Sequence, residues 1–282
     1  MGLVLDDVEA CIVSVWWATP MMRHMIELLQ FRHSPYNEKV RWALDLKQVP
    51  HRRRSLLPGP HVATVRRLTG RSTTPALRLD DGSVIDGSAH ILEWLESRWP
   101  QPALYPADPT EHAEALRIQR WFDDDLTPRI RRAVLDALLR QPLAFASVFG
   151  DGRPVAQRLA YACAVPLAAP LIRKGNGMAG AASVADGLRA ADEALDFVAR
   201  RAGADGYLVG AHFGLADLCA ASTLAVLAQP PGSPMSAPQP HGAAFAELLQ
   251  RYAAHPGIAW TRRLYARHRM AAHDFDGLSA AR

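Results

Sequence analysis

The order of short elements between Leu28 and Leu95 constrains the fold of this chain more than any other feature. Apolar runs and helical stripes alternate there as strand, helix, strand, helix, strand, strand and helix. The first two strands are expected to pair in parallel through a right-handed crossover, and the next two to form a hairpin around Asp81-Gly82. Nearly everything after this region has a helical pattern. The sequence therefore predicts an α+β protein, with a small α/β domain followed by an all-α domain.

The limits of the predicted elements follow from periodicity and breaker residues. The first domain has predicted strands at 26–31, 49–56, 75–79 and 84–85, and predicted helices at 35–47, 60–68 and 88–95. After a proline-rich linker at 101–109, helices are predicted at 110–141 (with Pro128 as a point where it can bend), 153–172, 181–201, 215–227, 243–254 and 258–269. We place an extension at 1–24, the α/β domain at 25–104 and the helical domain at 105–282.

The first predicted helix opens with Ser34-Pro35-Tyr36-Asn37. Serine is a favoured N-cap, and proline suits the first helical position because its missing N–H would have no partner there. Such a helix start gathers free N–H groups and the positive end of the helix dipole around one hydroxyl. This is a place to hold an anion, and we interpret that anion as a sulfur anion.

Composition and charge narrow the class of protein. The 282 residues carry a formal charge of +4, which favours small acidic ligands but does not by itself indicate nucleic acid. Cys11, Cys163 and Cys219 are scattered and lack metal-ligand spacing, so we expect no disulfide framework and no metal, and a reducing cytosol fits best. The apolar run at 11–18 follows acidic residues and is too short to span a bilayer, so secretion is not expected.

The chain resembles the cytosolic glutathione S-transferases over roughly residues 25–270. The matching pieces are, in order, Ser34-Pro35-Tyr36 with Lys39-Val40-Arg41, Thr74-Pro75-Ala76-Leu77, Asp81-Gly82-Ser83-Val84-Ile85, Ser88-Ala89, Ile91-Leu92-Glu93-Trp94-Leu95, Leu104-Tyr105-Pro106 and Gly210 to Asp217. Each piece is weak alone, and their shared order and spacing carry the resemblance. It implies a thioredoxin-like glutathione-binding domain, a helical domain that contacts a small hydrophobic electrophile, a homodimer, and glutathione as the cosubstrate.

Carried over by position, the resemblance implies a glutathione site on the first domain. Ser34 would be the catalytic hydroxyl, hydrogen-bonded to the glutathione sulfur. The backbone of Thr74, before a cis Pro75, would pair with the cysteinyl unit of the peptide. Ser88, capping the helix at 88–95, would take the γ-glutamyl carboxylate.

Two further residues belong to the predicted site with less support. Many family members have Glu or Gln directly before the carboxylate-binding serine, where this chain has Gly87 with Asp86 one residue further back. Asp86 is included for that reason, and recognition of the γ-glutamyl group is expected to be weakened or rearranged. Tyr36 is included as well, although its place on the inward stripe suits core packing.

Several side chains near these positions allow two interpretations. Asn37 is an alternative to Ser34 as the thiol partner, and His33 is expected to be an exposed loop residue. The run Asp123-Asp124-Asp125 is interpreted as a solvated acidic face, the alternative being contact with a partner subunit's glutathione. The cations Arg52, Arg53, Arg54, Arg66, Arg67 and Arg71 are interpreted as a solvated edge, without the aromatics of a nucleic-acid site.

One segment of the helical domain stands apart. Residues 159–172 are uncharged and contain Pro166 and Pro170, so they are too short and too broken to span a membrane. Core packing is expected there, and a roof over the substrate pocket or contact with a lipid surface are the alternatives.

Three functions remain open at this stage. The leading one is conjugation of glutathione to a small hydrophobic electrophile, or a related glutathione-dependent addition or isomerisation. The second is a non-catalytic binding or regulatory protein of the same fold. The third is a reductase or peroxidase that uses a protein cysteine, which the serine at position 34 does not support.

Overall fold

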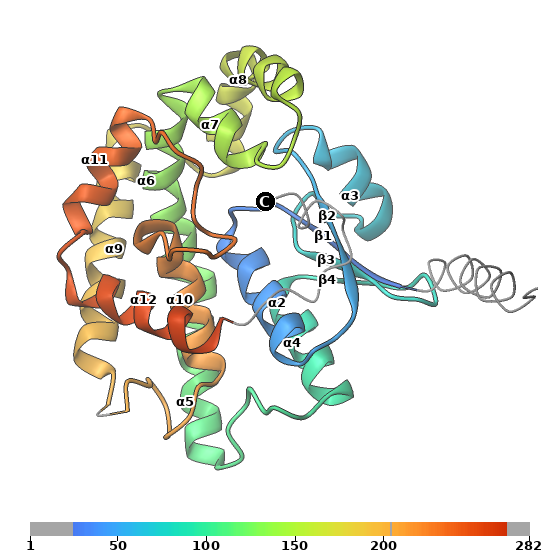
Figure 1. Cartoon of the computed structure of the whole chain (residues 1–282), viewed down its shortest axis with the longest axis vertical. Coiled ribbons are helices and arrows are strands. Elements are labelled where there is room, and N and C mark those ends of the chain that lie inside the picture. The colour runs from blue at the N-terminus through green and yellow to red at the C-terminus, as the bar shows by residue number, and fades with distance from the viewer. Residues whose placement is uncertain (1–24, 204, 270–282) are drawn as a thin grey trace, which may run out of the picture.

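The computed structural model describes residues 25–203 and 205–269, so the predicted extension at 1–24 lies outside the described residues. Its sheet has the strand order β2-β1-β3-β4, with β1 (Ile26–Gln30), β2 (His51–Ser55), β3 (Ala76–Arg78) and β4 (Val84–Asp86). The helices between and after these strands are α2 (Pro35–Leu46), α3 (His61–Thr69) and α4 (Ser88–Arg98). β1 pairs in parallel with β2 and antiparallel with β3, which pairs antiparallel with β4 (Figure 1). The predicted order of elements and the thioredoxin-like pattern are confirmed.

Alternating side chains of β1 serve two apolar layers. Leu28 is fully buried together with Leu77 in the main core, on the side where α2 packs against α4. Leu29 is buried on the other face, together with Val65 of α3. Because successive strand residues point to opposite faces, one short strand holds the helices on both sides of the sheet.

The start of α4 differs by one residue from the prediction. Gly87, not Ser88, is the N-cap, and Ser88 is the first helical residue. Gly87 has φ = 84°, in the left-handed region that glycine adopts without steric cost, and its carbonyl accepts the N–H of Ile91 at 3.1 Å. The prediction that Ser88 caps the helix is therefore wrong, although the hydroxyl still lies at the helix N-terminus.

The second domain contains no strand within its described residues. Its helical segments are α5 (Pro109–Arg120), η2 (Trp121–Leu126), α6 (Thr127–Leu139), α7 (Pro142–Phe149), α8 (Val155–Gly175), α9 (Ala181–Arg201), α10 (Leu215–Ala228), α11 (Ala243–Tyr252) and α12 (Pro256–His268). α7 was not predicted, because eight residues between two helix breakers are too few to show a 3.6-residue period. All six predicted helices of this domain are present.

The long predicted helix at 110–141 is a succession of three helical segments. α5 passes into the π-helical η2, which passes directly into α6. The π-helical turn ends next to Pro128, the second residue of α6. A proline has no N–H for the carbonyl four residues earlier, so widening of the preceding turn has a local cause.

α10 is buried along its whole length in the centre of the helical domain. At its start Asp217 accepts the N–H of Gly214 at 3.1 Å and the N–H of Leu208 at 2.9 Å. In a capping box the N-cap side chain would return a hydrogen bond, but glycine at 214 offers no hydroxyl for it. Asp217 therefore joins the helix start to the loop before it.

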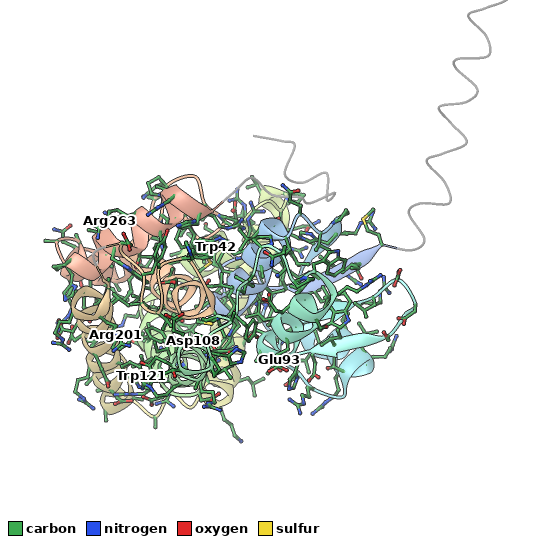
Figure 2. All side chains as sticks on the ribbon, turned by 90° about the horizontal axis from the view of Figure 1, so that it is seen from below. Trp42, Glu93, Asp108, Trp121, Arg201 and Arg263 are labelled. Carbon is green, nitrogen blue, oxygen red and sulfur yellow. The ribbon has the colours of Figure 1, made fainter. Side chains whose placement is uncertain are left out.

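Trp42, labelled in Figure 2, lies where α2 meets the helical domain. The indole is fully buried, stacks on Phe213 at 5.2 Å between ring centres, and donates its Nε1–H to the carbonyl of His268 at 3.1 Å. α2 therefore belongs to the cores of both domains.

The expectation of core packing for 159–172 is wrong for most of that segment. In α8 the buried residues are Tyr161, Ala162 and Val165, because the helix contacts the rest of the protein along one side, mainly through α7. With 21 residues α8 is also longer than predicted. By length and composition alone, α8 could span a membrane, and 17% of its most apolar window is buried in the protein. Two prolines, Pro166 and Pro170, lie inside the helix.

Candidate functional site

A cavity of about 440 Å³ lies between the two domains, at the N-terminal end of α2. The first domain contributes polar groups to it, among them Ser34, Tyr36 and Thr74. The helical domain contributes a mainly apolar wall from α6, α7 and α8, which includes Ile130, Val134, Leu138, Phe145, Phe149, Leu171 and Ile172. The cavity thus joins a polar side, which could orient a peptide, to an apolar side, which could hold a second molecule.

Ser34 occupies the N-cap position of α2 without capping it. Its backbone is extended, with φ = −117° and ψ = 128°, and its side chain makes no hydrogen bond to the first turn. Its carbonyl accepts the N–H of Glu38 at 2.8 Å, so the helix begins here. The half-buried hydroxyl lines the cavity, and it remains available to a ligand.

Thr74, Pro75, Asp86 and Ser88 are brought together by the β3–β4 pairing. The Thr74–Pro75 peptide bond is cis, as the family resemblance implied. The N–H of Gly87 donates to the carbonyl of Pro75 at 3.1 Å, and Ala76 pairs with Asp86, so the start of β3 lies beside the start of α4. Thr74 lines the cavity, whereas Pro75, Asp86 and the buried Ser88 are outside its lining.

The position of Asn37 does not suit the role of thiol partner, for which the sequence offered it as an alternative to Ser34. It is fully buried and does not line the cavity, and its Nδ2 donates to Oγ1 of Thr74 at 3.1 Å. Its side chain therefore holds Thr74 in position from behind.

Tyr36 connects the two domains. Its hydroxyl donates to the backbone carbonyl of Asp123 at 2.6 Å, and burial raises the pKa of the phenol far above its usual value. Lys39 forms an ion pair with the carboxylate of Asp123, which is largely buried. The interpretation of this acidic run as a solvated face is therefore wrong for Asp123, because α2 supplies a cation that the linear sequence does not show next to it.

Two predicted surface residues are buried instead. His33 lines the cavity, with Nε2 at 3.8 Å from Asp151, and burial lowers the pKa of its ring, so the expected exposed histidine is wrong. Arg53 of the predicted solvated edge is buried as well, and its Nη2 contacts both carboxylate oxygens of Asp45 at 2.6 Å. In both cases an acid from another element covers the cation or ring.

Arg131 is the site residue that sequence reasoning missed. It lies on α6 among the cavity-lining residues, and no ion pair joins it to any described residue. Its Nε is buried without a hydrogen-bond partner, and burial lowers the pKa of the guanidinium. An arginine stays charged in proteins, so an unpaired cation lies against an apolar cavity. In the sequence, the feature that could have revealed Arg131 is a positive charge beside the apolar helical stripe of Ile130, Val134 and Leu138.

The described residues include two cysteines, neither of which lines the cavity. Cys219 is buried, and burial raises the pKa of its thiol to about 12, whereas Cys163 is exposed on α8. In residues 25–203 and 205–269 no three His, Cys, Asp or Glu side chains are grouped as metal ligands.

Fold and cavity together define a two-domain protein in which a thioredoxin-like domain faces an all-helical one. The glutathione S-transferase N-terminal domain matches residues 28–103 and the glutathione S-transferase C-terminal domain matches residues 181–255, which together exceed half of the chain. The chain belongs to the glutathione S-transferase family.

Individual relatives add detail. A glutathione S-transferase from Methylobacterium radiotolerans, solved in complex with glutathione sulfonate, is 27% identical, with a TM-score of 0.57 over 86% of this chain and 91% of that one. Maleylacetoacetate isomerase of Pseudomonas aeruginosa is 38% identical over 74 residues, 26% of this chain and 34% of that protein. Maleylpyruvate isomerase of a Ralstonia species is 32% identical over 117 residues, 40% of this chain and 54% of that protein. The chain thus spans between about a third and about half of these curated relatives.

Proposed function

We propose that this protein is a glutathione transferase that ionises the glutathione thiol beside Ser34 and presents it to an electrophile in the cavity. The observation that carries the proposal is the start of α2. There the side chain of the N-cap residue Ser34 makes no capping hydrogen bond and lines a cavity between the two domains. The Methylobacterium relative, solved with glutathione sulfonate, supports glutathione as the cosubstrate.

Ionisation of the glutathione thiol near pH 7 needs only a modest stabilisation of the thiolate. A free thiol with a pKa near 8.5 is mostly protonated at neutral pH. A hydrogen bond to a charged group contributes about 1.5–3 kcal/mol and a helix N-terminus roughly 0.3–1 kcal/mol. At about 1.4 kcal/mol per unit, these effects lower the thiol pKa by about one to two units, so thiolate becomes the major form near pH 7.

The remaining predicted residues would hold the rest of the peptide. Thr74, fixed by Asn37, offers its backbone to the cysteinyl unit next to the cis Pro75. Ser88 and Asp86 lie at the start of α4, where the γ-glutamyl group would be bound. The Tyr36 hydroxyl is engaged with Asp123, so its proposed contribution is the backbone N–H in the first turn of α2.

Arg131 narrows the choice of electrophile. The apolar wall favours a hydrophobic body, and an unpaired guanidinium beside it favours a carboxylate on the same molecule. We propose that the electrophile is a small hydrophobic compound with an acidic group. A homodimer also remains part of the proposal, and sedimentation velocity tests it.

Isomerisation of a maleyl acid is the second candidate, and Arg131 favours it together with the two isomerases named above. The thiolate would add to one alkene carbon, and the double-bond electron pair would move onto the conjugated carbonyl oxygen. After rotation about the resulting single bond, expulsion of the same thiolate would restore the double bond in the trans form. Nothing is oxidised, reduced or consumed in this sequence.

Glutathione binding and thiolate formation can be tested directly. We expect the wild-type chain to be retained on immobilised glutathione, and its complex to show thiolate ultraviolet absorbance at a pH one to two units below that of free glutathione. In Ser34→Ala the thiolate absorbance should return toward the pH of the free thiol, whereas Ser83→Ala in the exposed hairpin should behave as wild type. If wild type binds no glutathione at millimolar concentration, the non-catalytic alternative replaces this proposal.

A further inference from the structure

The outer side of α8 presents a continuous apolar row to solvent. Val155, Leu159, Leu167 and Leu171 are 60%, 51%, 85% and 74% exposed. With the exposed Cys163 they occupy every fourth position along the helix, so their side chains follow one another over four turns. Isolated exposed leucines are ordinary, but a row of this length on one helix marks an interaction surface.

Two observations place this row in its surroundings. Leu143 of α7, the helix against which α8 packs, is also exposed, at 63%. At the C-terminal end of the row, Leu171 lines the cavity together with its neighbour Ile172. Figure 1 shows α8 at the outer edge of the molecule, beyond α7, so this surface is open to an approaching partner.

Charge around the row has one sign. Between Asp151 and Asp186 the sequence contains no acidic residue, and its charged residues there are Arg153, Arg158, Arg173 and Lys174. Arg153 donates to the carbonyl of Ser55 and Arg173 pairs with Asp136, whereas no ion pair joins the half-buried Arg158 or the exposed Lys174 to another described residue. An apolar helix face with Arg158 near one end and Lys174 at the other complements an anionic phospholipid surface, whose headgroups attract lysine and arginine while its acyl region accepts leucine.

We propose that the outer face of α8 docks this protein on an anionic phospholipid membrane, with the helix lying in the plane of the interface. A spanning orientation conflicts with the contacts of the inner face, because Tyr161 is buried and its hydroxyl donates to the carbonyl of Pro58 in the first domain at 2.8 Å. A symmetric contact with a second copy would bring the cations of one copy near those of the other, and this segment contains no acid to separate them.

Docking would bring the mouth of the cavity to the lipid, because Leu171 belongs to both surfaces. A lipophilic electrophile dissolved in the bilayer could then reach the cavity with little passage through water. This consequence rests on the proposed function, whereas the docking itself does not.

Flotation with lipid vesicles tests the docking. The full chain is mixed with vesicles of equimolar phosphatidylcholine and phosphatidylglycerol, or of phosphatidylcholine alone, without glutathione. We expect flotation with the anionic vesicles, weakening with added salt, and at least a roughly tenfold lower bound fraction for Leu159→Glu/Leu167→Glu. The matched control Ala182→Glu/Ala185→Glu adds the same charge at exposed positions of α9 and should float as wild type.

Three outcomes would overturn the proposal. They are a wild-type chain that does not float with anionic vesicles, a Leu159→Glu/Leu167→Glu variant that floats as well as wild type, and a change of oligomeric mass in that variant, which would assign the face to a second copy. Both substituted side chains are exposed, so the variant is expected to fold, and an unfolding midpoint in denaturant equal to that of wild type confirms this without reference to glutathione binding. Loss of flotation with retained glutathione binding would leave the proposed function intact.

Discussion

The two parts of α2 meet the helical domain in opposite ways. At the N-terminal end, the cavity is lined by Ser34, whose side chain does not cap the helix, and by Arg131, whose guanidinium has no ion pair. In the middle of the helix, Arg41 donates to Glu38 at 2.7 Å. Arg269, from the other end of the chain, donates to Glu38 at 2.9 Å and to Asp45 at 2.7 Å. The first region leaves Ser34 without a capping hydrogen bond and Arg131 without an ion pair, and the second pairs its charges within the protein.

The difference separates charges that are paired where the domains meet from a charge that has no partner at the cavity. Burial by itself would raise the pKa of Glu38, but the guanidinium groups of Arg269 and Arg41 outweigh it and hold the pKa below its usual value. Arg131 is half-buried and has no such partner, and its buried Nε, which makes no hydrogen bond, costs free energy when the cavity is empty. Under the proposed function, the unpaired Arg131 would bind the acidic group of the electrophile, whereas Glu38 is explained by the fold alone.

The largest expected effect comes from breaking the paired region. Glu38→Gln leaves the buried guanidinium of Arg41 without its anion and leaves Arg269 with Asp45 alone, so we expect the free energy of unfolding to fall by about 3–5 kcal/mol. Denaturant titration measures it, with Glu247→Gln at an exposed position of α11 as a control that should change stability little. Since the folded-state pKa of Glu38 is lowered, its contribution is present above the unfolded pKa and is lost as pH falls through the folded value. A loss no greater than the control's would mean that the network adds nothing to stability.

Asp217 provides an intermediate case, a buried carboxylate with hydrogen bonds but no cation. Burial raises its pKa to about 7, although two backbone N–H groups oppose the rise. The folded state therefore holds the proton more tightly than the unfolded one. The resulting stability is fully present below about pH 4 and is lost as pH rises through 7, by a few kcal/mol at about 1.4 kcal/mol per unit.

The pH dependence of unfolding in Asp217→Asn tests this. We expect the variant to lose less stability than wild type between pH 4 and 7, because the amide does not ionise. Equal pH slopes for the two proteins would show that the carboxylate is ionised throughout this range.

Arg131→Met tests the unpaired region. With an acidic electrophile we expect kcat/KM to fall about 10- to 150-fold, the equivalent of one lost charge-assisted hydrogen bond of about 1.5–3 kcal/mol. With a neutral electrophile the change should be small, and stability should be unchanged or improved. Arg132→Met is a matched control, since the next residue of α6 contacts Asp186 at 3.6 Å and does not line the cavity. An equal loss for acidic and neutral electrophiles would remove Arg131 from substrate recognition.

The smallest expected effect is at the boundary between the two regions. Tyr36→Phe removes the hydrogen bond to the carbonyl of Asp123, and we expect a loss of about 0.5–1.5 kcal/mol in stability with nearly unchanged thiolate absorbance of bound glutathione. Absorbance that shifts as much as in Ser34→Ala would instead place the phenol in the thiol chemistry.

Local patterns made the first domain predictable. The predicted strand at 26–31, the Ser34-Pro35 helix start and the Asp81-Gly82 turn are each decided by neighbouring residues, and the structure contains the corresponding elements. The candidate site was partly predictable for the same reason, since Ser34 and Thr74 both follow from short motifs and both line the cavity. Ser88 was misplaced by one position because Gly87 adopts a left-handed conformation that a capping rule does not anticipate.

Other features needed contacts between distant parts of the chain. Burial of His33 and Arg53 depends on acids that fold against them, and the exposure of α8 depends on how little of the protein lies beside it. An apolar helical pattern reads the same whether it faces a core or solvent, so periodicity could not distinguish them.

By itself, the sequence determined the order of elements, the family and the serine at the start of the first helix, because period, caps and turns act over a few residues. Only the tertiary structure decided which charges are paired and which are free. The guanidinium of Arg269 reaches Glu38 across 231 positions, while Arg131, much nearer in sequence, meets no acid. Pairing is a property of three-dimensional distance and burial, and no spacing along the chain encodes it.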